Sequence, residues 1–324
     1  MNTFVFTCGD INGIGPEIVI KTINKKTPSS RRKIIFIIPK NVFEASKEKI
    51  KPKFKFQIKK TLPKKWEKDE VIILDIGNYT QKIGRPTKAS GKAAYEAIIK
   101  ACELLKNKSA DAMITAPISK IALQKADINF PGHTELIANY FSVKNFSMMF
   151  VSNRMKAGLV TIHEPINNIS KLLTKEKLQN VINVIDYALK NDFGIPSPKI
   201  AVLGLNPHAG ENGKIGKEEV EVIQPVIKKK SRNVFGPFVP DAFFGTKNYN
   251  NYDCIVGIYH DQLLIPFKLL NFSTGVNYTA GLPIIRTSPD HGTAYDIAGK
   301  GIAEENSTLH AFNFAVKIAR NRRR

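Results

Sequence analysis

The 324-residue sequence is poor in cysteine, and its three cysteines, Cys8, Cys102 and Cys254, lie far apart without any CxxC spacing. A disulfide framework and a thiolate metal site are therefore not indicated, and we expect three small buried side chains. Long apolar runs are also missing, because stretches such as 34–38 are far shorter than the roughly 20 residues of a transmembrane helix. The first residues show neither a basic segment nor a small-residue cleavage site, so we expect a cytoplasmic protein that does not span a membrane.

Acidic residues are scarce beside basic ones: 49 Lys and Arg against 28 Asp and Glu give a formal net charge of +21. Such an excess is compatible with nucleic acid, an anionic membrane surface or anionic small substrates. Much of the charge lies in the lysine-rich segment 47–68 and in the run 320–324, and no nucleic-acid motif with ordered aromatic residues accompanies it. We interpret most of it as solvated surface, with attraction of anions as the alternative.

Short β-branched runs alternate with amphipathic stretches of helical period, which predicts an α/β protein with a largely parallel sheet. No internal repeat or low-complexity linker marks a domain boundary. The expected strands are 4–8, 33–38, 71–75, 112–115, 158–163, 200–205 and 254–259. The expected helices include 91–107, 118–125, 170–190 and 217–230, with Ser170 as the N-cap of the third.

Three of the six histidines closely follow apolar, strand-like runs: His163, His208 and His260. In open α/β sheets ligands bind beyond the carboxyl ends of the strands, so these imidazoles could converge on one pocket. Three histidines with an open coordination position suit a catalytic divalent metal that polarises a substrate oxygen. A single histidine at a strand end is also a common structural hydrogen-bonding residue, and spacing alone leaves both interpretations open.

A second group of polar residues indicates an anion site. His133 and Thr134 precede the apolar helical pattern 136–141, and free N–H groups at a helix N-terminus favour phosphate or carboxylate. The plain alternative is a threonine cap beside a solvated histidine. Further along, Lys268, Asn277 and Arg286 interrupt apolar sequence, for which the ordinary reason is a long side chain that reaches the surface.

The segment 9–17 is rich in glycine, follows the first expected strand and leads into a helix with Pro16 near its start. It does not have the spacing GxGxxG, and the chain contains no Walker A sequence. A standard Rossmann dinucleotide site is therefore not indicated, and a nicotinamide cofactor would have to bind in another way.

Taken together, the motifs resemble those of the 4-hydroxythreonine-4-phosphate dehydrogenase family of pyridoxal phosphate biosynthesis, in order and spacing, over nearly the whole chain. The chain departs from the family at Ile11 and Asn12, where a Pro-Ala pair is common, and in the segment 47–68. The segment 291–301 also resembles the adenosine-binding loop of isocitrate and isopropylmalate dehydrogenases, which bind NAD(P) without a Rossmann fold. The matching motifs are 13–17, 131–135, 205–211, 236–238 with Asp241, 259–262, 275–277 and 285–294.

The resemblance implies a role for each candidate residue. One divalent metal per active site is implied, and neutral imidazoles favour zinc or cobalt over magnesium, although its identity stays open. NAD or NADP is the implied cofactor. The implied ligands of the metal are His163, His208 and His260; the substrate residues are His133, Thr134, Lys268, Asn277 and Arg286; the cofactor residues are His291, Gly292 and Asp296; and the catalytic residues are Lys268, Asp241 and Asp261.

The family's reaction is oxidation of 4-phosphooxy-L-threonine by NAD, with decarboxylation to 3-amino-2-oxopropyl phosphate. The implied fold is that of isocitrate and isopropylmalate dehydrogenases: two α/β domains with a cleft between them, expected at 1–128 with 276–324 and at 129–275, in a homodimer whose active sites lie near the interface. Two alternatives stay open. One is a dehydrogenase of a related phosphorylated sugar acid, 4-phospho-threonate or 4-phospho-erythronate, and the other is a nucleic-acid-binding protein on a dehydrogenase fold.

Overall fold

The computed structural model describes residues 2–29, 32–67, 69–230 and 232–323. The chain forms two compact units, Met1–Ser142 with Leu282–Ala319, and Val143–Gly281 with Arg320–Arg324. It leaves the first unit and later returns to it. The first two crossings come later in the sequence than the expected boundaries after 128 and 275, so that His133 and Thr134 belong to the first unit. A third crossing follows Ala319, whereas the prediction kept 276–324 together.

In the first unit, six strands lie in the order β3-β4-β2-β1-β5-β12, and each neighbouring pair is parallel. Buried apolar side chains fill the central strands, and the ring of Phe312 packs against Phe4 and Phe6. The strands are β1 (Asn2–Thr7), β2 (Arg32–Ile38), β3 (Lys55–Lys59), β4 (Glu70–Asp75), β5 (Ala112–Thr115) and β12 (Ile285–Pro289).

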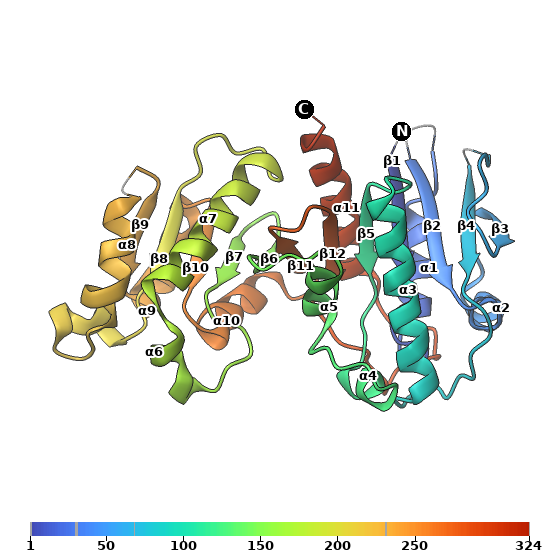
Figure 1. Ribbon diagram of the computed structural model, residues 1–324, viewed down its shortest axis with the longest axis horizontal. Helices are drawn as coiled ribbons and strands as arrows, with labels where there is room; N and C mark the ends of the chain where they lie inside the picture. Colours follow the sequence, from blue (N-terminus) through green and yellow to red (C-terminus); the bar gives the residue numbers. More distant parts are fainter. Residues whose placement is uncertain (1, 30–31, 68, 231, 324) are drawn as a thin grey trace. The chain divides into compact units, whose positions relative to one another are not determined.

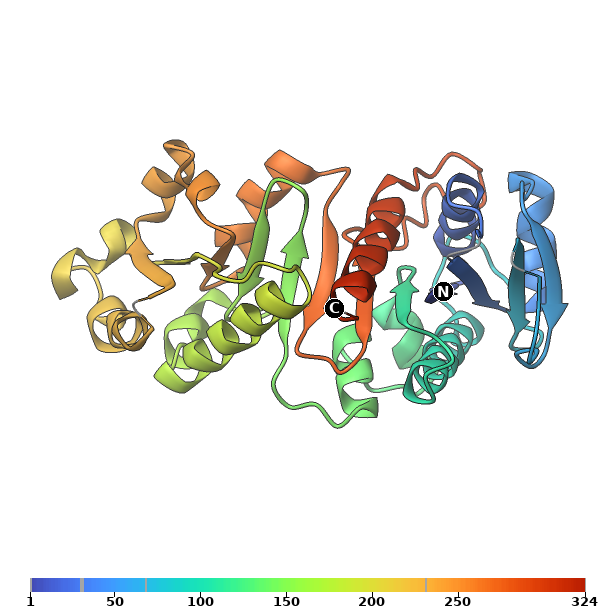
Figure 2. The same ribbon diagram turned by 90° about the horizontal axis from the view of Figure 1, so that it is seen from above.

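Helices cover both faces of these strands, with α3 on one face and α1 and α11 on the other (Figures 1 and 2). Helix α3 begins with a capping box, in which Thr87 and Ser90 each accept a hydrogen bond from the backbone N–H of the other. The helices are α1 (Gly15–Lys25), α2 (Lys40–Ile50), α3 (Lys88–Lys106), α4 (Lys120–Lys125), α5 (His133–Tyr140) and α11 (Asn306–Asn321).

In the second unit, the strand order is β11-β6-β7-β10-β8-β9. Strand β6 pairs antiparallel with both of its neighbours, whereas β7, β10, β8 and β9 pair in parallel. The predicted α/β class with a largely parallel sheet is therefore confirmed, with β6 as the exception. The strands are β6 (Ser147–Val151), β7 (Lys156–Leu159), β8 (Ile200–Leu203), β9 (Val234–Phe238), β10 (Cys254–Gly257) and β11 (Val276–Ala280).

Helices α7 and α10 pack on opposite faces of these strands (Figure 2). Helix α10 packs on the sheet through Leu263, Leu264 and Phe267. These side chains share a buried apolar core with Leu159 and Ile255. The helical segments are η1 (Ile166–Asn168), α6 (Ile169–Leu172), α7 (Lys175–Asn191), η2 (Pro207–Gly213), η3 (Glu219–Ile223), α8 (Gln224–Lys229), α9 (Pro240–Gly245), η4 (Asn248–Asn251) and α10 (His260–Asn271).

The predicted helix 170–190 begins later than its sequence indicated, and Ser170 is not its N-cap. Leu173 has an extended backbone, which ends α6 and separates it from α7. The cap of α7 is Thr174, whose hydroxyl accepts from the Lys177 N–H, whereas the Ser170 hydroxyl donates to the Glu218 carboxylate. Both residues are good caps, and only the backbone break selects between them.

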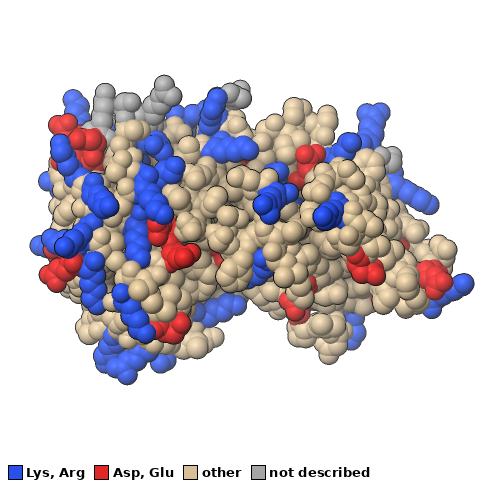
Figure 3. All heavy atoms as spheres, turned by 180° about the vertical axis from the view of Figure 1, so that it is seen from behind, with Lys and Arg blue, Asp and Glu red and all other residues tan. Residues whose placement is uncertain are grey.

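The three cysteines are free and buried, as predicted. Within the described ranges, none of the helices has the length and apolar character needed to cross a bilayer. The lysine-rich segment, predicted as solvated surface, also contributes the strand β3, with Lys55 and Lys59 exposed at its ends. On the face drawn in Figure 3, Lys and Arg side chains are dispersed and acidic residues lie among them.

Candidate active site

Three histidines lie just beyond the carboxyl ends of neighbouring strands in the second unit. Strand β10 lies between β7 and β8 and pairs in parallel with both, so the carboxyl ends of the three strands point the same way. His163 follows β7, His208 follows β8 and His260 follows β10. The strands end at Leu159, Leu203 and Gly257, earlier than predicted, so each histidine lies on the segment that turns away from the sheet.

Two of these histidines lie together. The ring centroids of His163 and His260 are 5.7 Å apart and their planes are tilted by 39°. The Nδ1 atom of His260 lies 2.6 Å from Asp261 Oδ1, which orients the ring and leaves Nε2 for a ligand. Among the residues that the structure describes, no group of three or more His, Cys, Asp or Glu side chains is close enough to hold a metal ion. The structure thus brings together two of the three histidines.

The third histidine, His208, begins a turn of left-handed backbone. All five residues of 208–212 have positive φ, between 43° and 77°, and only Gly210 among them is a glycine. Left-handed conformation costs about 1–2 kcal/mol for each residue with a side chain. Contacts elsewhere must therefore hold this turn in place, since strain of this kind persists only where its surroundings fix it.

The main support of the turn is Glu219, a fully buried carboxylate at the start of η3. Its Oε1 accepts from the backbone N–H of Leu205 at 2.7 Å and of Asn206 at 2.8 Å, and its Oε2 accepts from Asn206 Nδ2 at 2.9 Å. The same carboxylate packs against Gly210, where an added Cβ would lie 2.5 Å from Oε2. The sequence analysis did not identify Glu219 as a supporting residue, because in the sequence it is one of several charged residues in a helical pattern.

Gln262 provides a second support. Its Oε1 accepts from the Ile258 N–H at 2.7 Å, and its Nε2 donates to the Gly204 carbonyl at 2.5 Å. The side chain thereby joins the ends of β10 and β8, from which His260 and His208 depart. It lies within the motif 259–262 that the sequence analysis recognised, but no role was assigned to it.

Helix α10 carries further candidate residues. Lys268 lies two turns after His260 and lines the same open cavity of about 320 Å³, together with Asp261 and Leu264. Asp241 lies in the first turn of α9, which packs beside the His208 turn, and its side chain is exposed. Asp261 therefore lies beside His260, and Asp241 lies on a helix that packs against the segment of His208; both are exposed.

The residues predicted to bind an anion lie in the first unit, and we call them the anion pocket. Strands β5 and β12 are parallel neighbours, and Arg286 of β12 donates from Nε and Nη2 to the Thr115 hydroxyl at 3.1 and 3.0 Å. His133 and the buried Thr134 form the first turn of α5, where backbone N–H groups are free of helical partners. Thr115, which the sequence analysis missed, is the last residue of β5 and has no local signature.

The electrostatics of this pocket favour an anion. Burial and the charge of Arg286 hold the pKa of His133 well below its ordinary value, so the ring is neutral at pH 7. Its Nε2 is buried and has no hydrogen-bond partner. Burial lowers the pKa of Arg286 to about 10, so the guanidinium stays charged. The charge of Arg286, which also faces the Glu135 carboxylate, and the N–H groups at the start of α5 are groups that attract a phosphate.

The third set of candidates lies on the loop after β12. His291, Gly292 and Asp296 are exposed, and a Cβ added at Gly292 would meet nothing within 4 Å. The inner side of the loop is fixed, because the Tyr295 hydroxyl donates to Asp10 Oδ2 at 2.8 Å. The loop is thus open on the side that carries the predicted cofactor residues.

The unusual residue Asn12 links the glycine-rich turn to a neighbouring loop. Its Oδ1 accepts from the Lys82 N–H at 2.8 Å, and its Nδ2 donates to the Arg85 carbonyl at 2.9 Å and to the Thr87 hydroxyl at 3.1 Å. A side chain with both donor and acceptor is needed for these three bonds. The departure from the family's Pro-Ala pair therefore has a structural role of its own.

Comparison with known proteins gives consistent matches. The profile of the family described as pyridoxal phosphate biosynthetic protein PdxA matches residues 30–315. The 4-hydroxythreonine-4-phosphate dehydrogenase of Bacteroides thetaiotaomicron is 41% identical, over 98% of this chain and 89% of its own. A putative D-threonate 4-phosphate dehydrogenase of Oceanobacillus iheyensis is 40% identical, over 97% and 96%. The crystal structure of 4-hydroxythreonine-4-phosphate dehydrogenase from Klebsiella pneumoniae is 34% identical, with 98% of both chains covered and a TM-score of 0.87.

Proposed function

Since the chain belongs to the pyridoxal phosphate biosynthetic protein PdxA family, we propose that it oxidises 4-phosphooxy-L-threonine with NAD and releases CO₂. The carbon that bears the hydroxyl gives its hydride to NAD⁺ and the hydroxyl gives up its proton, which leaves a β-keto acid. The bond to the carboxylate carbon then breaks, and a proton joins the carbon that it leaves. The products are 3-amino-2-oxopropyl phosphate, CO₂ and NADH.

The observation that carries the proposal is the anion pocket of His133, Thr134 and Arg286. The substrate's phosphate is a dianion that accepts several hydrogen bonds. It would take hydrogen bonds from the backbone N–H groups of the first turn of α5 and from the Thr134 hydroxyl, an ionic one from Arg286, and one from His133 Nε2 once a proton has joined that nitrogen. Asn277 of β11, which is half-buried, is a further proposed substrate-binding residue.

The strand-end histidines are the proposed holders of a divalent metal. Such an ion, when bound, lowers the pKa of the substrate alcohol and stabilises negative charge on its oxygen. The 5.7 Å between the His163 and His260 rings fits two ligands of one ion, and the His208 turn, held beside β8, would complete the set. Imidazole ligands favour zinc or cobalt over magnesium.

Lys268 is the proposed proton donor. It is half-buried on the same cavity as His260, and an ammonium there can give a proton to the carbon that CO₂ has left. Asp261 would hold the His260 ring through Nδ1, and Asp241 is the proposed acceptor of a proton beside the His208 turn.

The open loop after β12 is the proposed dinucleotide site. His291 and Gly292 leave room for the adenine ring, and Asp296 would accept hydrogen bonds from the ribose hydroxyls. A carboxylate at that place would repel the 2′-phosphate of NADP. We therefore propose NAD as the preferred cofactor.

A second copy of the chain is the proposed partner. Ile265, Leu269 and Phe272 form an apolar stripe on α10, exposed by 59%, 82% and 84%. Their spacing places them on one helix face, beside Lys268. Exposed apolar patches of this kind commonly mark interaction sites. A homodimer that covered the stripe would bring the partner subunit next to Lys268.

The function is tested by following NADH absorbance with metal-stripped and metal-restored enzyme. We expect turnover of 4-phosphooxy-L-threonine only with metal present. The same assay with 4-phospho-D-threonate and 4-phospho-erythronate distinguishes the related dehydrogenases, because those acids lack the amino group. Activity on a sugar acid, with none on 4-phosphooxy-L-threonine, would replace the proposed substrate.

A further inference from the structure

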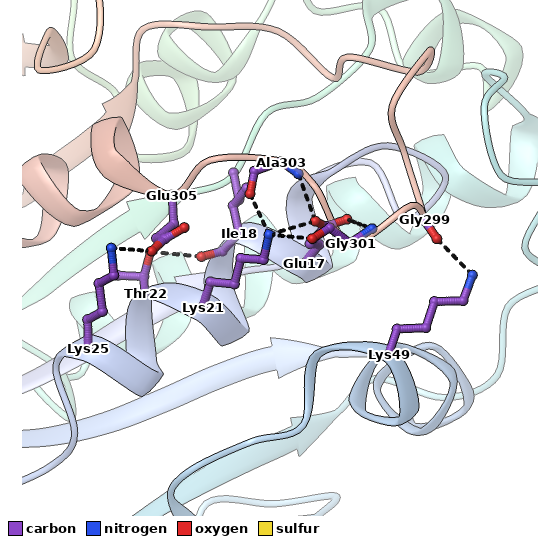
Figure 4. A network of polar contacts seen from close by, with 10 residues as sticks. All are labelled: Glu17, Ile18, Lys21, Thr22, Lys25, Lys49, Gly299, Gly301, Ala303 and Glu305. Carbon is purple, nitrogen blue, oxygen red and sulfur yellow. Dashed lines mark hydrogen bonds and ion pairs between the residues drawn. The ribbon is translucent and has the colours of Figure 1, made fainter.

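The segment 297–305 lies between the open cofactor loop and helix α11 and has no regular secondary structure. Figure 4 shows how side chains from α1 and α2 reach its backbone. Gly299 and Gly301 have φ values of +72° and +74°, which residues with side chains rarely adopt. Since no helix or sheet ladder orders this segment, its conformation depends on the contacts made by those side chains.

The central contact is Glu17, whose residue surface is only 5% exposed. Its Oε1 accepts from the Ala303 N–H at 2.9 Å, and its Oε2 accepts from the Gly301 N–H at 3.3 Å. A carboxylate that accepts two backbone N–H groups in a buried setting forms bonds stronger than those between neutral groups. The glycine-rich motif 13–17, which the catalytic scheme leaves without a role, supplies this carboxylate.

Lys21, one turn later on α1, binds the carbonyls of the same two residues. Its Nζ donates to the Gly301 carbonyl at 2.9 Å, to the Ala303 carbonyl at 2.6 Å and to Glu17 Oε1 at 3.0 Å. Glu17 and Lys21 together satisfy the N–H and the C=O groups of residues 301 and 303, as a neighbouring strand would. We call this pair the α1 clamp.

Two weaker contacts flank the α1 clamp. Lys49 of α2 donates to the Gly299 carbonyl at 2.8 Å, and Lys25 pairs with Glu305 at 2.5 Å. The segment also makes apolar contacts. Ala298 and Ala303 form a small buried cluster with Ile14 of the glycine-rich motif and Ile18 of α1. The Lys25 side chain is about half exposed, whereas Glu17 is buried, so we expect the α1 clamp to contribute more to the order of the segment.

We propose that Glu17 and Lys21 are positioning residues for the dinucleotide: they hold the segment 299–303 so that the loop from His291 to Asp296 keeps its binding conformation. This inference rests on the proposed function of that loop. The loop is fixed at Tyr295 and at the α1 clamp, and its outer side is open. A ligand that binds one loop conformation binds more weakly in proportion to the fraction of time spent in others.

The test uses Glu17→Gln and Lys21→Met in the metal-loaded, full-length protein, with NAD affinity measured by calorimetry. If the loop is ordered for about a tenth of the time in the variants, the Kd for NAD rises about tenfold. Amide hydrogen exchange over 291–305 should become faster, and the KM for the phosphorylated substrate should stay within about twofold. Lys21→Arg keeps the charge and the donors but presents them in a planar group, and it should lose less NAD affinity than Lys21→Met.

Lys25→Met is the matched control, because it removes a lysine from the same helix that contacts only Glu305 at this segment. It should change neither the Kd for NAD nor the exchange rate. If folded Glu17→Gln and Lys21→Met variants bind NAD as tightly as the wild type, the proposed role of the α1 clamp is wrong. The proposed cofactor site would not be affected by that result. A wild-type protein that does not bind NAD would instead overturn the proposed cofactor site, and with it the role of the clamp.

Discussion

His133 is the residue whose protonation most directly links the anion pocket to stability. Its pKa lies below its ordinary value near 6.5 in the folded protein, because the ring is buried beside Arg286. As the pH falls below about 6.5, the unfolded chain takes up a proton that the folded chain does not. The free energy of unfolding should therefore fall on acidification, by up to about 1.4 kcal/mol per pH unit from this group.

Urea unfolding at pH 7.5, 6.5 and 5.5 measures this contribution as a difference between the wild type and His133→Gln. The glutamine variant should lose less stability over the same range. His310, whose pKa is also lowered by burial, is present in both proteins and cancels in the comparison. Parallel stability curves for the two proteins would show that folding does not lower the pKa of His133.

Glu219 is the residue on which the His208 turn depends. In Glu219→Gln, the side-chain nitrogen faces donors on Asn206 and can no longer accept from them, so the strained turn relaxes. Removal of a group that orients a metal ligand typically costs 10–100-fold in metal affinity, and we expect a loss of about that size for Co²⁺ bound to the metal-free protein. Titration calorimetry gives the value. Glu221→Gln, an exposed neighbour on η3, is the control, and equal Co²⁺ affinity in all three proteins would contradict the prediction.

Helix α10 carries both candidate active-site residues and exposed apolar residues. It presents His260 and Lys268 to the open cavity, and it exposes the stripe of Ile265, Leu269 and Phe272 beside them. A glutamate at Leu269 would place a charge in the proposed dimer interface. Because central interface residues contribute about 2 kcal/mol or more, the dimer Kd of Leu269→Glu should rise at least about 30-fold.

Sedimentation velocity across a range of concentrations measures that change. Ile166→Glu is the matched control, since Ile166 is 78% exposed on η1 and lies outside the stripe. It should leave the association unchanged. A Leu269→Glu protein that stays dimeric at the lowest concentration would place the interface on another surface.

The elements differed in how readily the sequence predicted them. Strands β2 and β4 are continuous apolar runs, and the pattern located both. The sequence analysis missed β3, β6, β9, β11 and β12. In β11 and β12, Asn277 and Arg286 interrupt the expected apolar sequence.

For the molecule as a whole, the same limit applies to the candidate site. A histidine after a strand is a local feature, so the places of His163, His208 and His260 beyond their strands could be predicted from the sequence, whereas their role as metal ligands stays a prediction. Thr115, Glu17 and Glu219 act through partners distant in sequence or through backbone atoms, and nothing near them in the chain marks those contacts. Knowledge of the fold was needed to find them.

Part of the excess positive charge lies at strand β3, at the end of the first unit's strand order, where it affects how two copies of the chain could associate. It pairs with β4 and ends the strand order of the first unit, so one row of its backbone groups is a ready template for another chain. Lys55 and Lys59 stand exposed at its two ends. A strand of a second copy added at this edge would bring like charges together. We therefore expect these lysines to disfavour pairing between the β3 edges of two copies.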